Sequence, residues 1–170
     1  QELHQKTKIE FKREKMNLIN IKNQLKKLKL KYPPIFDKKD HDKYVNDWRE
    51  QYTGATISIL RPSDAQEVSN IMKFAFANEI PIIPQGGNTG LCGGATPDKT
   101  GNSIMISLEK MNLIRSFNVK AQTITVDSGV ILSKIHEKVE EKNLFFPLSL
   151  GSKGSCTVSY THLRAHETEE

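Results

Sequence analysis

Apolar residues recur along this chain with two different periods, which divide it into predicted helices and strands. The first helical pattern follows Met16, where apolar side chains return every third or fourth residue at Leu18, Ile21, Leu25 and Leu28. This spacing places them on one stripe of a helix, with lysines on its other faces. The helix should end near Tyr32, because the two prolines that follow restrict the backbone. We expect a surface helix packed on the body of the protein, in preference to one bound to a membrane.

A strand, a helix and a second strand are predicted next. Residues Ala55–Leu60 are rich in isoleucine and stand between a glycine and a proline, which is typical of a strand. Ser63 can cap the following helix, with Gln66 as its capping-box partner. The predicted buried stripe of that helix is Ala65, Val68, Ile71, Met72, Ala75 and Phe76. Residues Ile80–Pro84 are short and β-branched, so they complete a β-α-β unit.

The second half of the chain continues the alternation of strands with helices. Residues Ser103–Leu108 and Thr123–Val126 are predicted strands. A second amphipathic helix, ending near Lys142, is indicated by the apolar residues Ile131, Ile135 and Val139. His136 lies on this helix, where a solvated position or one at the edge of the core is favoured over a catalytic role.

A glycine loop, Pro84–Gly94, follows the Ile80–Pro84 strand and holds five of the chain's ten glycines. Glycine permits positive φ and leaves room for a ligand, so successive N–H groups can converge on an anion such as a pyrophosphate. Neither common phosphate motif matches: Leu91 follows Gly90 where a P-loop needs lysine, and the spacing of GxGxxG is absent. From spacing alone, an anion-binding loop and a glycine-rich structural turn remain equal alternatives.

Charge and composition argue against a nucleic-acid-binding, membrane-spanning or secreted protein. The net charge is +5, but residues 6–31 carry +8, so the rest of the chain is slightly acidic. Few aromatic residues accompany the basic segment, which disfavours nucleic-acid binding. No apolar run approaches the length of a membrane span, and no secretory signal is evident. Cys92 and Cys156 form no CxxC pair, so a reduced compartment, by default the cytoplasm, is expected.

The two ends of the chain differ from its middle. Residues 1–15 begin with glutamine and show no apolar stripe, so this segment need not be native and Met16 is a candidate start. Residues Val158–Thr168 read VSYTHLRAHET, which resembles a translated sequencing adapter. His162 and His166 have the spacing of metal ligands on a helix, but the glutamate of HExxH is absent. We expect no metal site there, and a chain that is an N-terminal fragment.

Three motifs carry a resemblance to a known family. The first is Asp47-Trp48-Arg49 with Tyr52, followed by Leu60-Arg61-Pro62; the second is the glycine loop; the third is Phe146–Cys156, which reads FPLSLGSKGSC. Together they make residues 44–156 similar to the flavin-binding half of the FAD-linked D-2-hydroxy-acid dehydrogenases. That group includes glycolate oxidase flavin subunits, D-lactate dehydrogenases and D-2-hydroxyglutarate dehydrogenases.

The resemblance implies an α+β fold: the first subdomain of a PCMH-type FAD-binding domain, preceded by an N-terminal helix. Residues 1–43 would form a basic extension and helix, residues 44–156 the truncated domain, and residues 157–170 an artefactual tail. In this family FAD lies between two α+β subdomains, with its pyrophosphate held by backbone N–H groups of the glycine loop. The residues implied to contact FAD are Pro84, Gln85, Gly86, Gly87, Asn88, Thr89, Gly90, Leu91, Ser128, Gly129, Leu148, Leu150, Gly151, Gly154, Ser155 and Cys156. For Ser128 and Gly129, an ordinary strand-to-helix turn is nearly as well supported.

The same resemblance implies that FAD is bound without a covalent bond and that the enzyme oxidises a 2-hydroxy acid. Some relatives bond the flavin through a histidine in the glycine loop, where this chain has Asn88. The implied reaction oxidises D-lactate, glycolate or D-2-hydroxyglutarate to the 2-oxo acid. The substrate domain, the catalytic groups and any metal ligands would lie beyond Cys156, so His4, His41 and His136 are given no catalytic role.

The resemblance also implies partners for the enzyme, and two alternative functions remain open. The expected partners are the 2-hydroxy acid and an electron acceptor, either a quinone, a cytochrome or an electron-transfer flavoprotein, with peripheral attachment to a membrane left open. One alternative is a reductase of the same fold that acts on a cell-wall precursor. The other is a non-catalytic anion-binding or interaction module that ends at Glu170.

Overall fold

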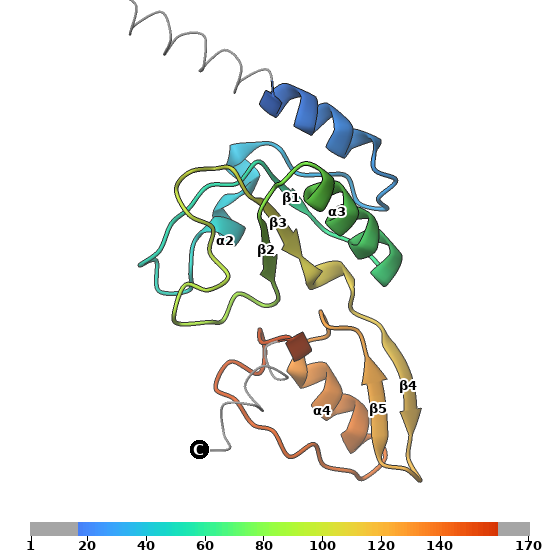
Figure 1. The fold of residues 1–170 in the computed structure, drawn as a ribbon. Helices are drawn as coiled ribbons and strands as arrows, with labels where there is room; N and C mark the ends of the chain where they lie inside the picture. The colour runs from blue at the N-terminus through green and yellow to red at the C-terminus, as the bar shows by residue number, and fades with distance from the viewer. Residues whose placement is uncertain (1–16, 160–170) are drawn as a thin grey trace, which may run out of the picture.

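The computed structural model describes residues 17–159, which form a mixed α+β structure in two parts (Figure 1). The larger part is built on a parallel sheet of β1 (Ser58–Leu60), β3 (Ile104–Ser107) and β2 (Ile82–Gln85), in that order. The predicted β-α-β unit is present, but β3 lies between its two strands and pairs in parallel with both. All four residues of β3 are buried, as expected of a central strand.

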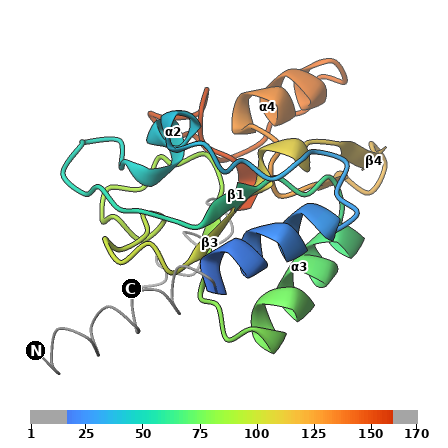
Figure 2. The ribbon, with the colours of Figure 1, turned by 90° about the horizontal axis from the view of Figure 1, so that it is seen from above.

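The two faces of this sheet are covered differently. The N-terminal helix, residues 17–27, and α3 (Ala65–Ala77) lie side by side on one face (Figure 2). Ile21 and Leu25 of that helix are buried in the core with Ile71, so the predicted surface helix packed on the body is confirmed. On the opposite face Tyr44, from the short helix α2 (Asp42–Val45), packs on Ile59 and Met105. Two 3-10 turns, Lys38–Asp40 and Leu108–Lys110, precede α2 and follow β3.

The cap of α3 differs from the prediction by one residue. Asp64, not Ser63, is the N-cap, and its carboxylate accepts a hydrogen bond of 2.9 Å from the N–H of Glu67. Glu67 in turn accepts from the N–H of Ser63 at 2.7 Å and from that of Lys31 at 2.6 Å. Asp64 and Glu67 are three residues apart, as a capping pair requires, and their carboxylates take these backbone N–H groups, so the helix begins one residue later than predicted.

The predicted buried stripe of α3 is partly wrong. Ile71 and Ala75 are buried, but Met72 is 46% exposed and Phe76 is 88% exposed. Ala65 is exposed too, and Val68 is half-buried. Because Glu67 is buried to bind the backbone at Ser63 and Lys31, the inward face of the helix is centred on Glu67, Ile71 and Ala75.

The smaller part combines a two-stranded hairpin with a helix. Strand β4 (Ile114–Asn118) pairs antiparallel with β5 (Thr123–Val126), and α4 (Leu132–Glu140) packs on them through Ile135 and Val139. The bounds of β5 are those predicted, whereas β4 was not predicted. His136 is half-buried, and its ring meets that of Phe146 edge-on at 5.8 Å, which places it at the edge of this small core.

The end of the described chain returns to the smaller part. Thr157 forms a β-bridge with Ile131, and the N–H of Val158 donates to the carbonyl of Val130 at 3.0 Å. The predicted boundary at residue 156 thus lies inside a packed region, and the prediction of an artefactual tail otherwise falls on residues 160–170, outside the described part. The same holds for residues 1–15, for His4, and for His162 and His166.

Candidate functional site

The glycine loop leaves the carboxyl end of β2 and is anchored by Gln85. This side chain is buried, and its amide donates to the carbonyl of Tyr44 at 2.8 Å and to that of Ala95 at 3.1 Å. The first bond joins the start of the loop to α2, and the second joins it to Ala95, directly after the end of the loop. Gln85 therefore fixes the conformation of the loop, whereas Pro84 is exposed at its first position.

Two glycines bring the loop against the end of the third motif. A Cβ on Gly87 would overlap the carbonyl oxygen of Ser155, and one on Gly86 would overlap the hydroxyls of Thr157 and Ser159. The N–H of Gly87 donates to Thr157 Oγ1 at 3.1 Å. The structure therefore brings two predicted flavin segments into contact, and it gives the glycines a packing role that spacing did not indicate.

The next two residues carry polar groups that are open to a ligand. Asn88 has φ of 54°, a conformation that asparagine tolerates better than most residues, and its amide donates to the carbonyl of Asn46 at 2.8 Å. Thr89 Oγ1 is buried without a hydrogen-bond partner among the described residues. Nor do the backbone N–H groups of Asn88 and Thr89 have an acceptor in this part of the chain.

Two adjoining hollows open where these segments meet. The large cleft, of about 850 Å³, lies between residues 42–50, the glycine loop and residues 150–155. The small hollow, of about 230 Å³, is lined by residues of β2 and α4 and by Gly129. They share four lining residues, namely Lys43, Gly87, Asn88 and Ser155. Of the other residues expected to contact FAD, the hollows bring together Gln85, Gly86, Thr89, Leu91, Gly129, Leu150 and Gly151.

The remaining predicted residues line neither hollow: Pro84, Gly90, Ser128, Leu148, Gly154 and Cys156. Cys156 is fully buried, and its carbonyl accepts from the N–H of Leu132 at 2.9 Å, so it belongs to the packing beneath the site. Gly129 has a packing role as well, because a Cβ there would overlap the carbonyl oxygen of Leu108.

Comparison with known proteins identifies the family. The sequence model of the FAD binding domain matches residues 57–159, which hold both glycine-rich segments of the site. The chain belongs to this family. The chain is 43% identical over 72% of its length to a candidate mitochondrial D-lactate dehydrogenase of Schizosaccharomyces pombe. It is 30% identical over 83% of its length to the D-2-hydroxyglutarate dehydrogenase of Xanthomonas citri.

The chain spans only part of the length of these relatives, 23% of the first and 29% of the second. Among solved structures, an alkyldihydroxyacetonephosphate synthase superposes with a TM-score of 0.72 over 82% of this chain and 28% of the synthase chain. At 18% sequence identity this likeness shows the fold alone, and it confirms the predicted fold class.

The residues present fit FAD. The volume of the large cleft lies within the usual range of small-molecule sites, roughly 300–1,000 Å³. Within residues 17–159, the Thr89 hydroxyl and the N–H groups of Asn88 and Thr89 have no hydrogen-bond partner, and such donors suit phosphate or carbonyl oxygens. A Cβ on Gly151, at the opposite wall, would meet no atom of the described residues. The residues of these two segments that line the hollows and could hold the cofactor are Gly86, Gly87, Asn88, Thr89 and Gly151, although the N–H of Gly87 already donates to Thr157.

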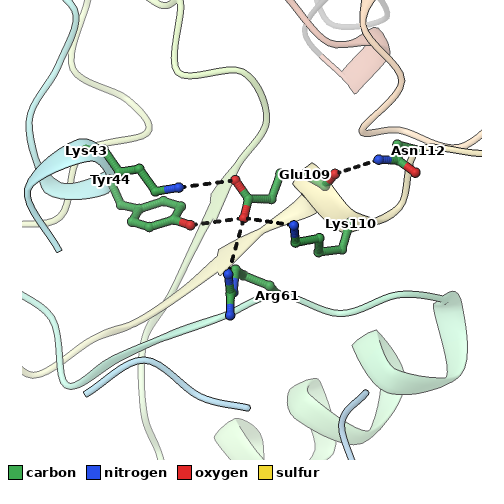
Figure 3. A network of polar contacts seen from close by, with 6 residues as sticks. All are labelled: Lys43, Tyr44, Arg61, Glu109, Lys110 and Asn112. Carbon is green, nitrogen blue, oxygen red and sulfur yellow. Dashed lines mark hydrogen bonds and ion pairs between the residues drawn. The ribbon is translucent and has the colours of Figure 1, made fainter. Parts of the chain in front are cut away.

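A charged cluster beside the small hollow was missed by the sequence analysis (Figure 3). Glu109 accepts a hydrogen bond of 3.0 Å from the Tyr44 hydroxyl and lies 3.8 Å from Lys43 Nζ, 3.7 Å from Arg61 and 4.0 Å from Lys110. Burial raises the pKa of the Tyr44 phenol, and contact with Tyr44 raises that of the Lys43 ammonium. Three separate segments, residues 43–44, Arg61 and residues 109–110, supply these side chains, so no local pattern could have predicted the cluster.

Asp47 fixes the turn in residues 46–53, which forms one side of the large cleft. Its carboxylate accepts from the N–H of Tyr52 at 2.6 Å and from that of Arg49 at 3.2 Å, and these backbone bonds lower its pKa. Asn46 and Thr53 form a β-bridge across the turn. Trp48, at the tip, is 71% exposed and lines the cleft.

We expect Asp47 to make stability depend on acid pH. A carboxyl whose pKa is lowered by folding stabilises the fold fully above its unfolded pKa of about 3.9, and this contribution is lost as pH falls through the folded pKa. Urea unfolding of the wild type and of Asp47→Asn across this range measures the effect. The difference between the two should shrink toward low pH, and parallel profiles would contradict the assignment.

Among residues 17–159, no helix combines the length and the apolar character needed to cross a membrane. The same residues contain no group of three or more His, Cys, Asp or Glu side chains arranged to hold a metal ion.

Proposed function

We propose that this chain is the FAD-binding part of a flavin-dependent oxidoreductase that converts a D-2-hydroxy acid, of the D-lactate, glycolate or D-2-hydroxyglutarate type, to its 2-oxo acid. The observation that carries the proposal is the contact between the glycine loop and residues 150–155 around a cleft with open donors. The substrate class is supported by two relatives, which are named as a D-lactate dehydrogenase and a D-2-hydroxyglutarate dehydrogenase.

In this proposal the domain binds and orients the cofactor. The N–H groups of Asn88 and Thr89, with the Thr89 hydroxyl, would hold its polar atoms, and Leu150 and Leu91 would border its apolar surface. When bound, FAD would accept the hydride, which is the α-hydrogen together with the electron pair of its bond to the substrate α-carbon. The base that takes the hydroxyl proton and the cations that bind the carboxylate are proposed to lie outside this domain.

Anaerobic reduction of the flavin tests the reaction. Because the base and the carboxylate-binding cations are proposed to lie outside this domain, we expect residues 1–170 alone to be inactive, and the test uses the full-length flavoprotein. It is mixed with D-lactate, D-2-hydroxyglutarate or glycolate, and the visible absorbance of the flavin is followed. At least one of the three should bleach it, whereas L-lactate, the matched enantiomer, should not. If a cell-wall precursor oxidises pre-reduced flavin and no hydroxy acid bleaches the oxidised form, the reductase alternative is the better account. A protein that binds no flavin leaves only the interaction module.

The flavin is proposed to be held without a covalent bond. Asn88, at the place of the histidine in some relatives, carries an amide that already donates to Asn46 and has no nucleophilic nitrogen. Acid precipitation should therefore release essentially all the flavin into the supernatant. Flavin fluorescence that stays with the denatured protein on a gel would contradict this.

The acceptor and the compartment stay predictions from the sequence. We propose a quinone, a cytochrome or an electron-transfer flavoprotein as the acceptor, because reduced flavin can pass electrons to each. A cytoplasmic location, with peripheral attachment to a membrane as the variant, is proposed from the sequence, although one relative is named as mitochondrial. We propose no nucleic-acid partner.

A further inference from the structure

The two hollows differ in the sign of the charge around them. The large cleft is lined by three acidic side chains, Asp42, Asp47 and Glu50, against one lysine. The small hollow is lined by Lys43 and Lys134 against one acid, Glu109. Charges attract and repel more strongly where water is partly excluded. An anionic group is therefore favoured in the small hollow and disfavoured in the large cleft.

Lys43 is the cation that borders both hollows, next to Gly87 and Asn88. Its Nζ lies 3.8 Å from Glu109 Oε2, which is longer than a charge-assisted hydrogen bond of about 2.7–2.9 Å. The Lys43 side chain is 66% exposed. Nζ also lies 4.5 Å from the centre of the Tyr44 ring. Neither contact is a short charge-assisted hydrogen bond, so the ammonium group can turn toward a second anion.

Glu109 does not depend on Lys43 for its neutralisation. Arg61 and Lys110 approach the same carboxylate, and the Tyr44 hydroxyl donates to it (Figure 3). Three cations around one carboxylate leave a surplus of positive charge in the cluster. If Lys43 turned toward a phosphate, Glu109 would still be paired, so no partly buried carboxylate would be left without a counter-charge.

We propose that Lys43 binds the phosphates of FAD in the small hollow, beside Gly87 and Asn88. The assignment rests on the proposed function, and it adds a side-chain cation to the backbone donors of the glycine loop. Lysine suits this role because it binds phosphate as a point charge that needs no fixed geometry. The rings of the cofactor would then extend into the large cleft, whose acidic walls disfavour the phosphates.

Binding of FAD and of riboflavin, which lacks phosphates, tests the assignment. Each is titrated into protein freed of its flavin, and quenching of flavin fluorescence gives the Kd. Lys43→Met should weaken FAD binding roughly 10-fold or more, since a hydrogen bond between charged groups is lost. Riboflavin binding should stay unchanged, and Lys43→Arg should restore most of the FAD affinity.

Lys110→Met is the matched control, because Lys110 contacts the same carboxylate but lines neither hollow. It should change the Kd for FAD far less than Lys43→Met does. Equal weakening by both variants would overturn the assignment in favour of a general field effect, and equal loss of FAD and riboflavin would overturn it in favour of a structural role. A wild-type protein that binds neither flavin would refute the proposed function itself.

Discussion

Gly87→Val is expected to abolish FAD binding, although it changes no charge. The added Cβ would overlap the Ser155 carbonyl, so the glycine loop and residues 150–155 must separate. Separation breaks the bond between the Gly87 N–H and Thr157 Oγ1 and removes one wall of the cleft. Overpacking of this kind also costs about 1–3 kcal/mol of stability.

The flavin absorbance of the purified protein measures this effect directly, and thermal unfolding measures the stability. Gly94→Ala is the matched control, because a Cβ at Gly94 would meet no protein atom and this glycine lines neither hollow. It should purify yellow, with a melting temperature close to that of the wild type. A yellow Gly87→Val protein with wild-type affinity for FAD would show that the two segments do not build the site together.

Leu25→Ala is expected to lower the free energy of unfolding by about 2–5 kcal/mol, as large-to-small changes in a core do. Leu25 has no exposed surface and shares a core cluster with Ile71 and Ile104, so the substitution leaves a cavity between the N-terminal helix and the sheet. Chemical denaturation, followed by circular dichroism, gives the change.

Ile19→Ala on the same helix separates packing from helix propensity. Ile19 is 53% exposed, so its loss should change stability by less than about 0.5 kcal/mol. Equal effects of the two substitutions would mean that the helix is not docked on the sheet through Leu25.

Much of the fold could be predicted because its elements carry a clear local pattern. The stripe through Ile21 and Leu25 predicted the face on which the N-terminal helix packs, and Thr123–Val126 gave β5 with its observed bounds. The order of the sheet could not be read in this way, since the insertion of β3 between β1 and β2 depends on pairing between distant segments.

Two of the predictions about helices and strands were wrong for physical reasons. The stripe on α3 was placed wrongly because Phe76 and Met72 are apolar but exposed, whereas the charged Glu67 is buried to accept backbone bonds. Strand β4 was missed because Arg115 and Ser116 interrupt its apolar pattern. Arg115 instead forms a bidentate ion pair with Asp127, with contacts of 2.8 and 3.1 Å, which ties the hairpin to the turn before α4.

The part of the candidate site that could be predicted from the sequence is the part that is rich in glycine. Their density marked the loop, but spacing alone left open whether a ligand or packing required them. The structure shows packing at Gly87 and Gly129, and open space at Gly151. Lys43 and Glu109 lay outside any motif, because only the folded chain brings them to one hollow.

Flavin content is the measurement that tests the central claim most directly. The protein is purified, supplied with excess FAD and desalted, and the flavin that remains bound is quantified against the protein. An equimolar amount of FAD, released intact by acid, is the result that a cleft between the glycine loop and residues 150–155 predicts. A protein that stays folded by circular dichroism but retains no flavin would contradict the account.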